Sequence, residues 1–119
     1  MSTAALALVA ADSARAACQF EPARIGYGFE STMKGEANSG KPCGFALTAA
    51  GPAGASGFRV VQPPHHGVAG VGESYGMPVI GYRSVASYRG PDEFVVTFVG
   101  GVFGQPAQPG SIRVQLDVK

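Results

Sequence analysis

The sequence predicts an all-β fold, an antiparallel β-sandwich of about seven strands that forms one domain. Val outnumbers Leu by 13 to 4, and β-branched side chains fit a pleated sheet better than a helix. The 18 glycines and 9 prolines divide the chain into short apolar stretches, whose length suits strands separated by turns. After Ala17, no window has apolar residues at helical spacing over the length of a full helix. A chain of 119 residues is long enough to bury one core.

The charge balance argues against a nucleic-acid partner. The chain has 9 Lys and Arg against 8 Asp and Glu, a formal net charge of +1, and only 14% of its residues are charged. Proteins that bind nucleic acids cluster Lys and Arg along one surface, and the sequence has no such stripe. No stretch approaches the roughly 20 apolar residues of a transmembrane helix, so we expect no membrane-spanning segment.

Residues 1–16 have the pattern of a secretory signal peptide. An apolar run over 4–11 is followed by Ala14-Arg15-Ala16, whose outer small residues are typical of a cleavage site before Ala17. No basic residue precedes the run, so a short alanine-rich helix is the alternative interpretation. The sequence thus predicts a signal peptide over 1–16, a single domain over 17–119, and a periplasmic or secreted protein.

The two cysteines, Cys18 and Cys43, are expected to form a disulfide. An exported protein folds in an oxidising compartment, where paired cysteines are normally bridged. The alternative is two separate free thiols, which a protein interior tolerates. Neither cysteine has a second Cys or a His at ligand spacing, so we expect no structural metal.

Alternating apolar and polar residues predict the strands of the domain. The clearest is 111–118, in which Ile112, Val114, Leu116 and Val118 alternate with polar residues, as in a strand with one face on a core. In 93–99, the expected inward residues are Phe94, Val96 and Phe98. The full set of predicted strands is 23–30, 44–49, 58–62, 68–71, 79–83, 93–99 and 111–118, with loops over 35–42, 51–57 and 100–110. The glycine-rich run 67–72 lacks the residues of a phosphate-binding loop and is predicted to be a flexible hairpin.

The segment from Pro64 onward contains residues at characteristic spacings. It starts with Pro64, His66 and Gly67, and its second part, 82–94, reads Y-R-S-V-A-S-Y-R-G-P-D-E-F. The spacing of its Tyr, aromatic, Gly, Asp and Phe positions resembles that of bacterial immunoglobulin-like, cadherin-like modules of secreted proteins, in particular small single-domain members from alphaproteobacteria. The stretch departs from the family at Ser84 and Ser87, where Pro and Gly are usual. The resemblance implies an immunoglobulin-like sandwich and a role in adhesion, spacing or ligand binding.

The residues of this stretch are predicted to determine the fold rather than to form an active site. Gly90 would allow a tight turn, and Asp92 would accept hydrogen bonds from backbone N–H groups of that turn. Phe94 would be the first inward residue of the next strand, and Gly67 would let the chain turn after the two histidines. The predicted structural motif comprises Gly67, Tyr82, Tyr88, Gly90, Asp92 and Phe94.

Side chains capable of catalysis or metal binding are sparse. His65 and His66 are adjacent, and adjacent residues of an extended segment point to opposite faces, so one metal ion would not easily bind both rings. No G-x-S-x-G nucleophile motif occurs, and the carboxylates are too scattered for a calcium site. We therefore expect no enzyme, no cofactor and no metal. The alternative hypothesis is a small periplasmic metal carrier or enzyme centred on His65 and His66.

Aromatic and cationic residues are candidates for a recognition surface. Tyr27, Tyr75, Arg83 and Arg89 are predicted to form an exposed patch for a glycan or a protein, although the tyrosine rings would equally suit burial at the ends of a sandwich. The leading hypothesis is a secreted or periplasmic, non-enzymatic module that binds a protein or glycan of the envelope or the cell exterior through its loops or a sheet edge. Homodimerisation by pairing of an unpaired edge strand is a third hypothesis.

Overall fold

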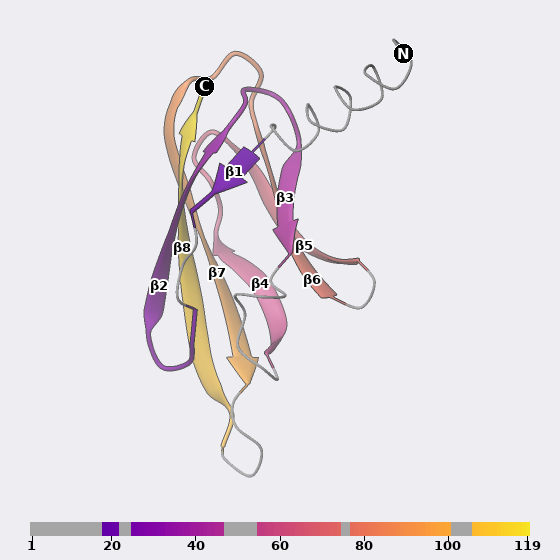
Figure 1. Cartoon of the computed structure of the whole chain (residues 1–119), viewed down its shortest axis with the longest axis vertical. Helices are drawn as coiled ribbons and strands as arrows, with labels where there is room; N and C mark the ends of the chain where they lie inside the picture. Colours follow the sequence, from indigo (N-terminus) through magenta and orange to yellow (C-terminus); the bar gives the residue numbers. More distant parts are fainter. Residues whose placement is uncertain (1–17, 22–24, 47–54, 75–76, 101–105) are drawn as a thin grey trace, which may run out of the picture.

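The computed structural model describes residues 18–21, 25–46, 55–74, 77–100 and 106–119. These residues form two stacked β-sheets and contain no helix (Figure 1). The all-β prediction is therefore confirmed, and the two sheets fit a sandwich. The strands are β1 (Cys18–Phe20), β2 (Glu30–Ala37), β3 (Cys43–Ala46), β4 (Ser56–Gln62), β5 (Gly67–Ser74), β6 (Met77–Ser84), β7 (Gly90–Gly100) and β8 (Gln108–Val118).

The larger sheet has five strands in the order β1-β2-β8-β7-β4, and the smaller has three in the order β3-β6-β5. All pairs are antiparallel except β2 with β8, which run parallel from Glu30 opposite Ser111 to Ala37 opposite Val118. The expectation of a wholly antiparallel arrangement is wrong at this pair. The chain enters β2 beside the start of β8, where the N–H of Gly28 donates to the carbonyl of Pro109 at 2.7 Å, and both strands then run in the same direction.

The first part of the chain differs most from the prediction. The predicted strand 23–30 is wrong over 25–29, which lie outside any strand, and 22–24 are outside the described residues. The strand is instead β2, which extends into the segment predicted as the loop 35–42. Its inward positions include Ser31, Met33 and Ala37, which are buried. Small and polar residues on the inner face give a weak hydrophobic signal, so the period of two was not recognisable there.

The core lies between the two sheets and is dominated by β7 and β8. The predicted inward residues are buried on both strands, with Phe94, Val96, Ile112 and Val114 fully inaccessible to solvent. The ring of Phe98 stacks on Phe58 of β4 with centroids 5.2 Å apart. Burying an aliphatic or aromatic side chain of this size stabilises by about 1.5–3 kcal/mol, so these two strands carry most of the packing energy.

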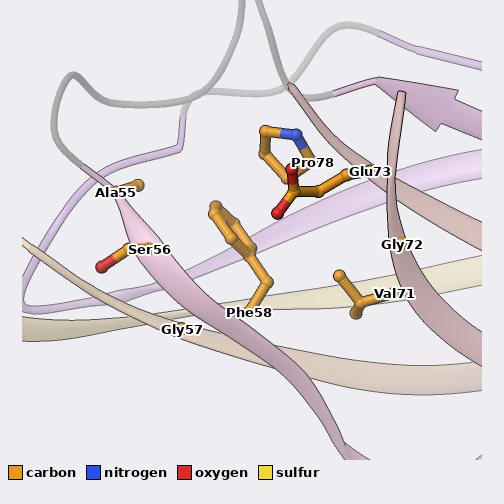
Figure 2. A pocket seen from close by; sticks show the side chains of 8 residues that line it. All are labelled: Ala55, Ser56, Gly57, Phe58, Val71, Gly72, Glu73 and Pro78. Carbon is orange, nitrogen blue, oxygen red and sulfur yellow. The ribbon is translucent and has the colours of Figure 1, made fainter. Parts of the chain in front are cut away.

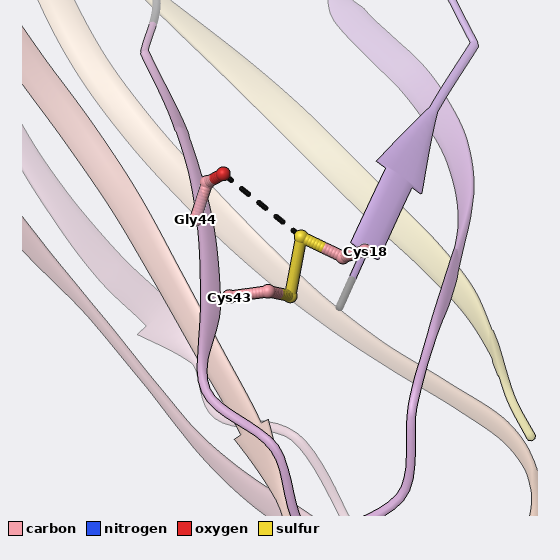
Figure 3. Close-up of a disulfide and its surroundings, with 3 residues drawn as sticks. All are labelled: Cys18, Cys43 and Gly44. Atoms are coloured by element: carbon pink, nitrogen blue, oxygen red, sulfur yellow. Dashed lines mark hydrogen bonds between the residues drawn. A yellow bond between two sulfur atoms is a disulfide. The ribbon is translucent and has the colours of Figure 1, made fainter. Parts of the chain in front are cut away.

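One side of the sandwich is covalently closed. Cys18 of β1 and Cys43 of β3 form a disulfide with Cα atoms 5.6 Å apart, as predicted (Figure 3). Beside it, the rings of Phe20 and Phe45 pack with centroids 4.4 Å apart. The disulfide therefore joins an edge strand of the larger sheet to an edge strand of the smaller one. The opposite side, where β4 and β5 are the edge strands, has no such link among the described residues.

The signal-peptide prediction for 1–16 lies outside the described residues. Among the residues that the structure does describe, no helix has the length and apolar character needed to cross a membrane.

Candidate functional site

The buried carboxylate of Asp92 organises one end of the sandwich. Only 5% of this residue is exposed. Its Oδ1 accepts the backbone N–H groups of His65 and Glu93, both at 2.9 Å. Its Oδ2 accepts the N–H of His66 at 3.2 Å and the hydroxyl of Tyr82 at 2.7 Å. Asp92 thus fastens the segment between β4 and β5 to strands of both sheets.

These partners differ from the predicted ones. The sequence predicts that the donors to Asp92 lie in the turn at Gly90. Apart from the N–H of the adjacent Glu93, the donors come instead from distant parts of the chain. Asp92 faces inward on β7, in phase with Phe94, and therefore meets the segment that crosses from one sheet to the other. The contacts support a structural role for this carboxylate.

Tyr82 acts as a permanent donor to Asp92. Burial, followed by the hydrogen bond to the carboxylate, raises the pKa of the Tyr82 phenol well above its usual value. The phenol therefore stays protonated across the physiological range, and its hydroxyl hydrogen remains committed to Asp92. Such a group stabilises the fold but is unsuited to shuttle protons.

The glycines of the motif are required by close approaches. At Gly90 the backbone has a φ of +132°, and a Cβ there would lie 3.0 Å from the Tyr88 hydroxyl, which itself donates to the carbonyl of Pro91. At Gly67 a Cβ would lie 2.8 Å from the Cα of Ser84. Gly67 therefore allows β5 to approach β6, which differs from the predicted role in a turn.

The rings of the two histidines do not lie side by side. Their ring centroids are 6.4 Å apart with the planes inclined at 70°, and the His66 ring stacks on Tyr88 at 3.9 Å. The described residues contain no group of three His, Cys, Asp or Glu side chains placed to hold a metal ion. A shallow cleft of about 540 Å³ lies beside these rings, but its polar side chains Glu93 and Gln115 are bonded to one another at 3.1 Å.

Of the predicted aromatic and cationic patch, the structure places Tyr27 apart from Arg83 and Arg89. Tyr27 packs against Phe98, with ring centroids 5.7 Å apart, near the start of β8. Arg83, next to the end of β6, donates to the carbonyl of Gly40 at 3.1 Å, and Arg89 directly precedes β7. Gly90, which follows Arg89, pairs with Val118 at the end of β8, whereas Tyr27 lies near the start of β8. Tyr75 is outside the described residues.

The outer face of the five-stranded sheet carries charges that are paired with one another. Arg113 of β8 contacts Glu30 of β2 at 2.8 Å and Glu93 of β7 at 2.6 Å. The Gln115 amide and, after it, Arg113 hold the pKa of Glu93 below its usual value. Arg113, Glu30 and Glu93 already satisfy one another, so this group is a poor candidate for recognising a charged ligand.

The edge strand β5 has the properties of an interaction surface. In the described residues it pairs only with β6, in an unbroken register from Gly67 to Ser74. Its outer face bears Val68, which is 68% exposed, and two glycines, Gly70 and Gly72, at which a Cβ would meet no atom within 4 Å. Its inner face bears Ala69 and Val71, which pack against the core. Glu73 is its only charged residue.

A cleft of about 600 Å³ borders this edge, between β4 and the β5–β6 hairpin. Figure 2 shows the ring of Phe58 directed into the cleft toward Pro78 and Glu73, with Val71 beside it. The cleft lies where the three-stranded sheet ends and the five-stranded sheet extends to β4. Half-buried apolar side chains are therefore accessible next to the β5 edge, with which no other described strand pairs.

The neighbouring edge, β4, is protected in ways that β5 is not. Its register with β7 is broken between Ser56 and Arg59 and again between Val60 and Gln62, and Gly57 adopts a φ of +66°. Bulges and charged side chains are devices by which proteins prevent strand addition at an edge. Of these two edges, β5 is therefore the one open to another strand.

The sequence pattern of 67–72 predicts a flexible hairpin and does not indicate an exposed sheet edge. The run does form the first strand of the β5–β6 hairpin. The available signal was the alternation of Val68, Gly70 and Gly72 with Ala69 and Val71, uncharged and without proline, which is unusual for an edge.

A scan with protein-family models finds no match to the chain, and a search of curated proteins finds no similar protein. The immunoglobulin-like resemblance thus stays a prediction, and a functional assignment depends on the geometry described above.

Proposed function

We propose that this chain is an exported, non-enzymatic immunoglobulin-like module that binds an extended segment of a partner protein by adding it as a strand to β5. The observation that carries the proposal is a regular edge strand with one charged residue, bordered by a cleft that exposes the apolar side chains of Phe58, Val71 and Pro78 beside Glu73. The partner would be a protein of the periplasm, the cell envelope or the exterior.

The strand order supports the immunoglobulin-like assignment. In such domains, strands B, E and D pair in one sheet and C, F and G in the other. Here β3, β6 and β5 follow the first order, and β4, β7 and β8 follow the second. The two N-terminal strands depart from this pattern, since β2 pairs with β8 and β1 pairs with β2, and neither pairs with β3. The resemblance of 82–94 points the same way.

The disulfide supports export. Disulfides persist in oxidising compartments and are rare where the cytosol keeps thiols reduced. Cys18 and Cys43 join two edge strands that otherwise share no ladder, so a reducing environment would remove the covalent link between the sheets on this side. The need for an oxidising compartment agrees with the signal peptide predicted from 1–16.

Strand addition matches the chemistry of the β5 edge. The unpaired N–H and C=O groups of an edge strand bond an extended peptide regardless of its sequence, while pockets for alternate side chains give specificity. Each hydrogen bond would contribute about 0.5–1.5 kcal/mol net. The cleft at Phe58 and Val71 would receive apolar side chains from the peptide. A glycan would gain little here, because the surface offers few polar side chains.

We expect Val71→Lys to abolish peptide binding at this edge. An inward-pointing lysine at an edge reaches water in the free protein but is buried when a strand is added, so it blocks the addition. The measurement is selection of a displayed library of random twelve-residue peptides, followed by titration of the enriched peptides against both proteins. The matched control is Val61→Lys, which puts the same charge on an exposed position of β4.

The proposal predicts enriched peptides with alternating apolar residues that bind the wild type and Val61→Lys but not Val71→Lys. A library from which no peptide is enriched would contradict it. Peptides that bind Val71→Lys as tightly as the wild type would also contradict it, because their site would lie elsewhere.

A further inference from the structure

We infer that the strand received by β5 is the β5 of a second copy of this chain, paired antiparallel about a two-fold axis at Gly70. This inference rests on the proposed function and names its partner. The two three-stranded sheets would become one continuous sheet of six strands.

The geometry of β5 selects the register. A two-fold axis perpendicular to the sheet sets residues of the same face opposite each other. An axis at Gly70 uses nearly the whole strand and sets Val68 opposite Gly72 and Ala69 opposite Val71. Gly70 then lies opposite its own copy.

The side chains of β5 are complementary to themselves in this register. On the outer face, the exposed Val68 of one copy would cover Gly72 of the other, beside which the free chain has open space. On the inner face, the small apolar Ala69 and Val71 of the second copy would extend over the cleft that contains Phe58. Apolar surface would therefore be buried on both faces without a clash with a large side chain.

The charges also permit self-pairing. Glu73, the only charged residue of β5, would lie opposite Gly67. The two Glu73 side chains would be at opposite ends of the ladder, roughly 20 Å apart at about 3.4 Å per residue, where salt screens their repulsion. The pairing uses the free edge of both β5 strands, so it ends at a dimer and does not propagate.

Charge substitutions at Gly70 test this interface. Gly70→Lys and Gly70→Glu each set like charges opposite one another at the two-fold axis, whereas an equimolar mixture sets Lys opposite Glu. Both side chains have room in the free protein, because a Cβ at Gly70 meets no atom within 4 Å. Sedimentation velocity of the full-length, disulfide-bonded chain over a concentration series gives the dimer dissociation constant, and circular dichroism checks that each variant folds.

We expect a wild-type dimer that forms with rising concentration, a dissociation constant raised at least about tenfold in each variant alone, and heterodimers restored in the mixture. Val61→Lys, on β4, should leave the dissociation constant unchanged. A wild type that stays monomeric while enriched peptides bind β5 would overturn this inference and leave the proposed function standing. A monomer that binds no peptide would overturn both. A dimer unaffected by either Gly70 variant would overturn the β5 interface.

Discussion

Replacing Asp92 by alanine is expected to lower the free energy of unfolding by at least about 3 kcal/mol. Four donors lose their acceptor in this variant, namely three backbone N–H groups and the hydroxyl of Tyr82. A buried donor left unsatisfied costs about 1–3 kcal/mol, and water admitted at the partly buried histidine backbone recovers part of that loss. Denaturant unfolding monitored by circular dichroism measures the effect as a lower midpoint at constant slope.

Two further variants separate the hydrogen bonds from the charge. Asp92→Asn keeps the volume but turns an NH₂ group toward donors, and we expect it to cost less than Asp92→Ala because the Tyr82 hydroxyl can rotate to accept. The matched control is Asp117→Ala, which removes an exposed carboxylate from β8 and should change stability by less than about 0.5 kcal/mol. Equal effects of Asp92→Ala and Asp117→Ala would contradict the role assigned to Asp92.

Removing the disulfide is expected to cost about 3 kcal/mol. The cross-link joins residues 25 apart in sequence, and a loop of this size restricts the unfolded chain by about that amount in the chain-entropy model. The double variant Cys18→Ala/Cys43→Ala, which leaves no free thiol, should unfold at a correspondingly lower denaturant concentration. Comparison with the wild type in the presence of reductant is the control, because the reduced wild type should behave like the variant.

Removing the disulfide should destabilise β1 more than the rest of the domain. β1 is only three residues long and, among the described strands, pairs with β2 alone. Its amides should therefore exchange faster in the variant, whereas those of β7 and β8 should change only with global stability. A variant as stable as the oxidised wild type would show that the Phe20–Phe45 packing holds this side without the cross-link.

The fold was predictable where one strong physical signal decided it. The alternation in 93–99 and 111–118 gave the two central strands and their inward residues, because a strand with one buried face must alternate. The same rule failed at β2, whose inner face includes Ser31 and the small Ala37. The parallel pairing of β2 with β8 joins segments about 80 residues apart, and no local pattern encodes such a contact.

The candidate surface was less predictable than the fold for a similar reason. Asp92 could be identified as a hydrogen-bond acceptor from its spacing to Gly90, but its burial and its partners at His65 and His66 depend on how the chain crosses between sheets. The run 67–72 could be identified as part of a hairpin, yet a strand becomes an edge only through the order of the whole sheet. The alternation of residues shows which face of a strand is buried, but it does not show which strand lies at the edge of the sheet.

Backbone hydrogen exchange distinguishes a β5 strand that receives a partner strand from one that does not. Exchange is followed by mass spectrometry over Ser56–Gln62 and Gly67–Ser74, at low and high protein concentration and with a saturating peptide selected from the library. We expect Gly67–Ser74 to gain protection at high concentration and with peptide, while Ser56–Gln62 does not. Unchanged exchange in Gly67–Ser74 under every condition, or protection gained in Ser56–Gln62 instead, would contradict this expectation.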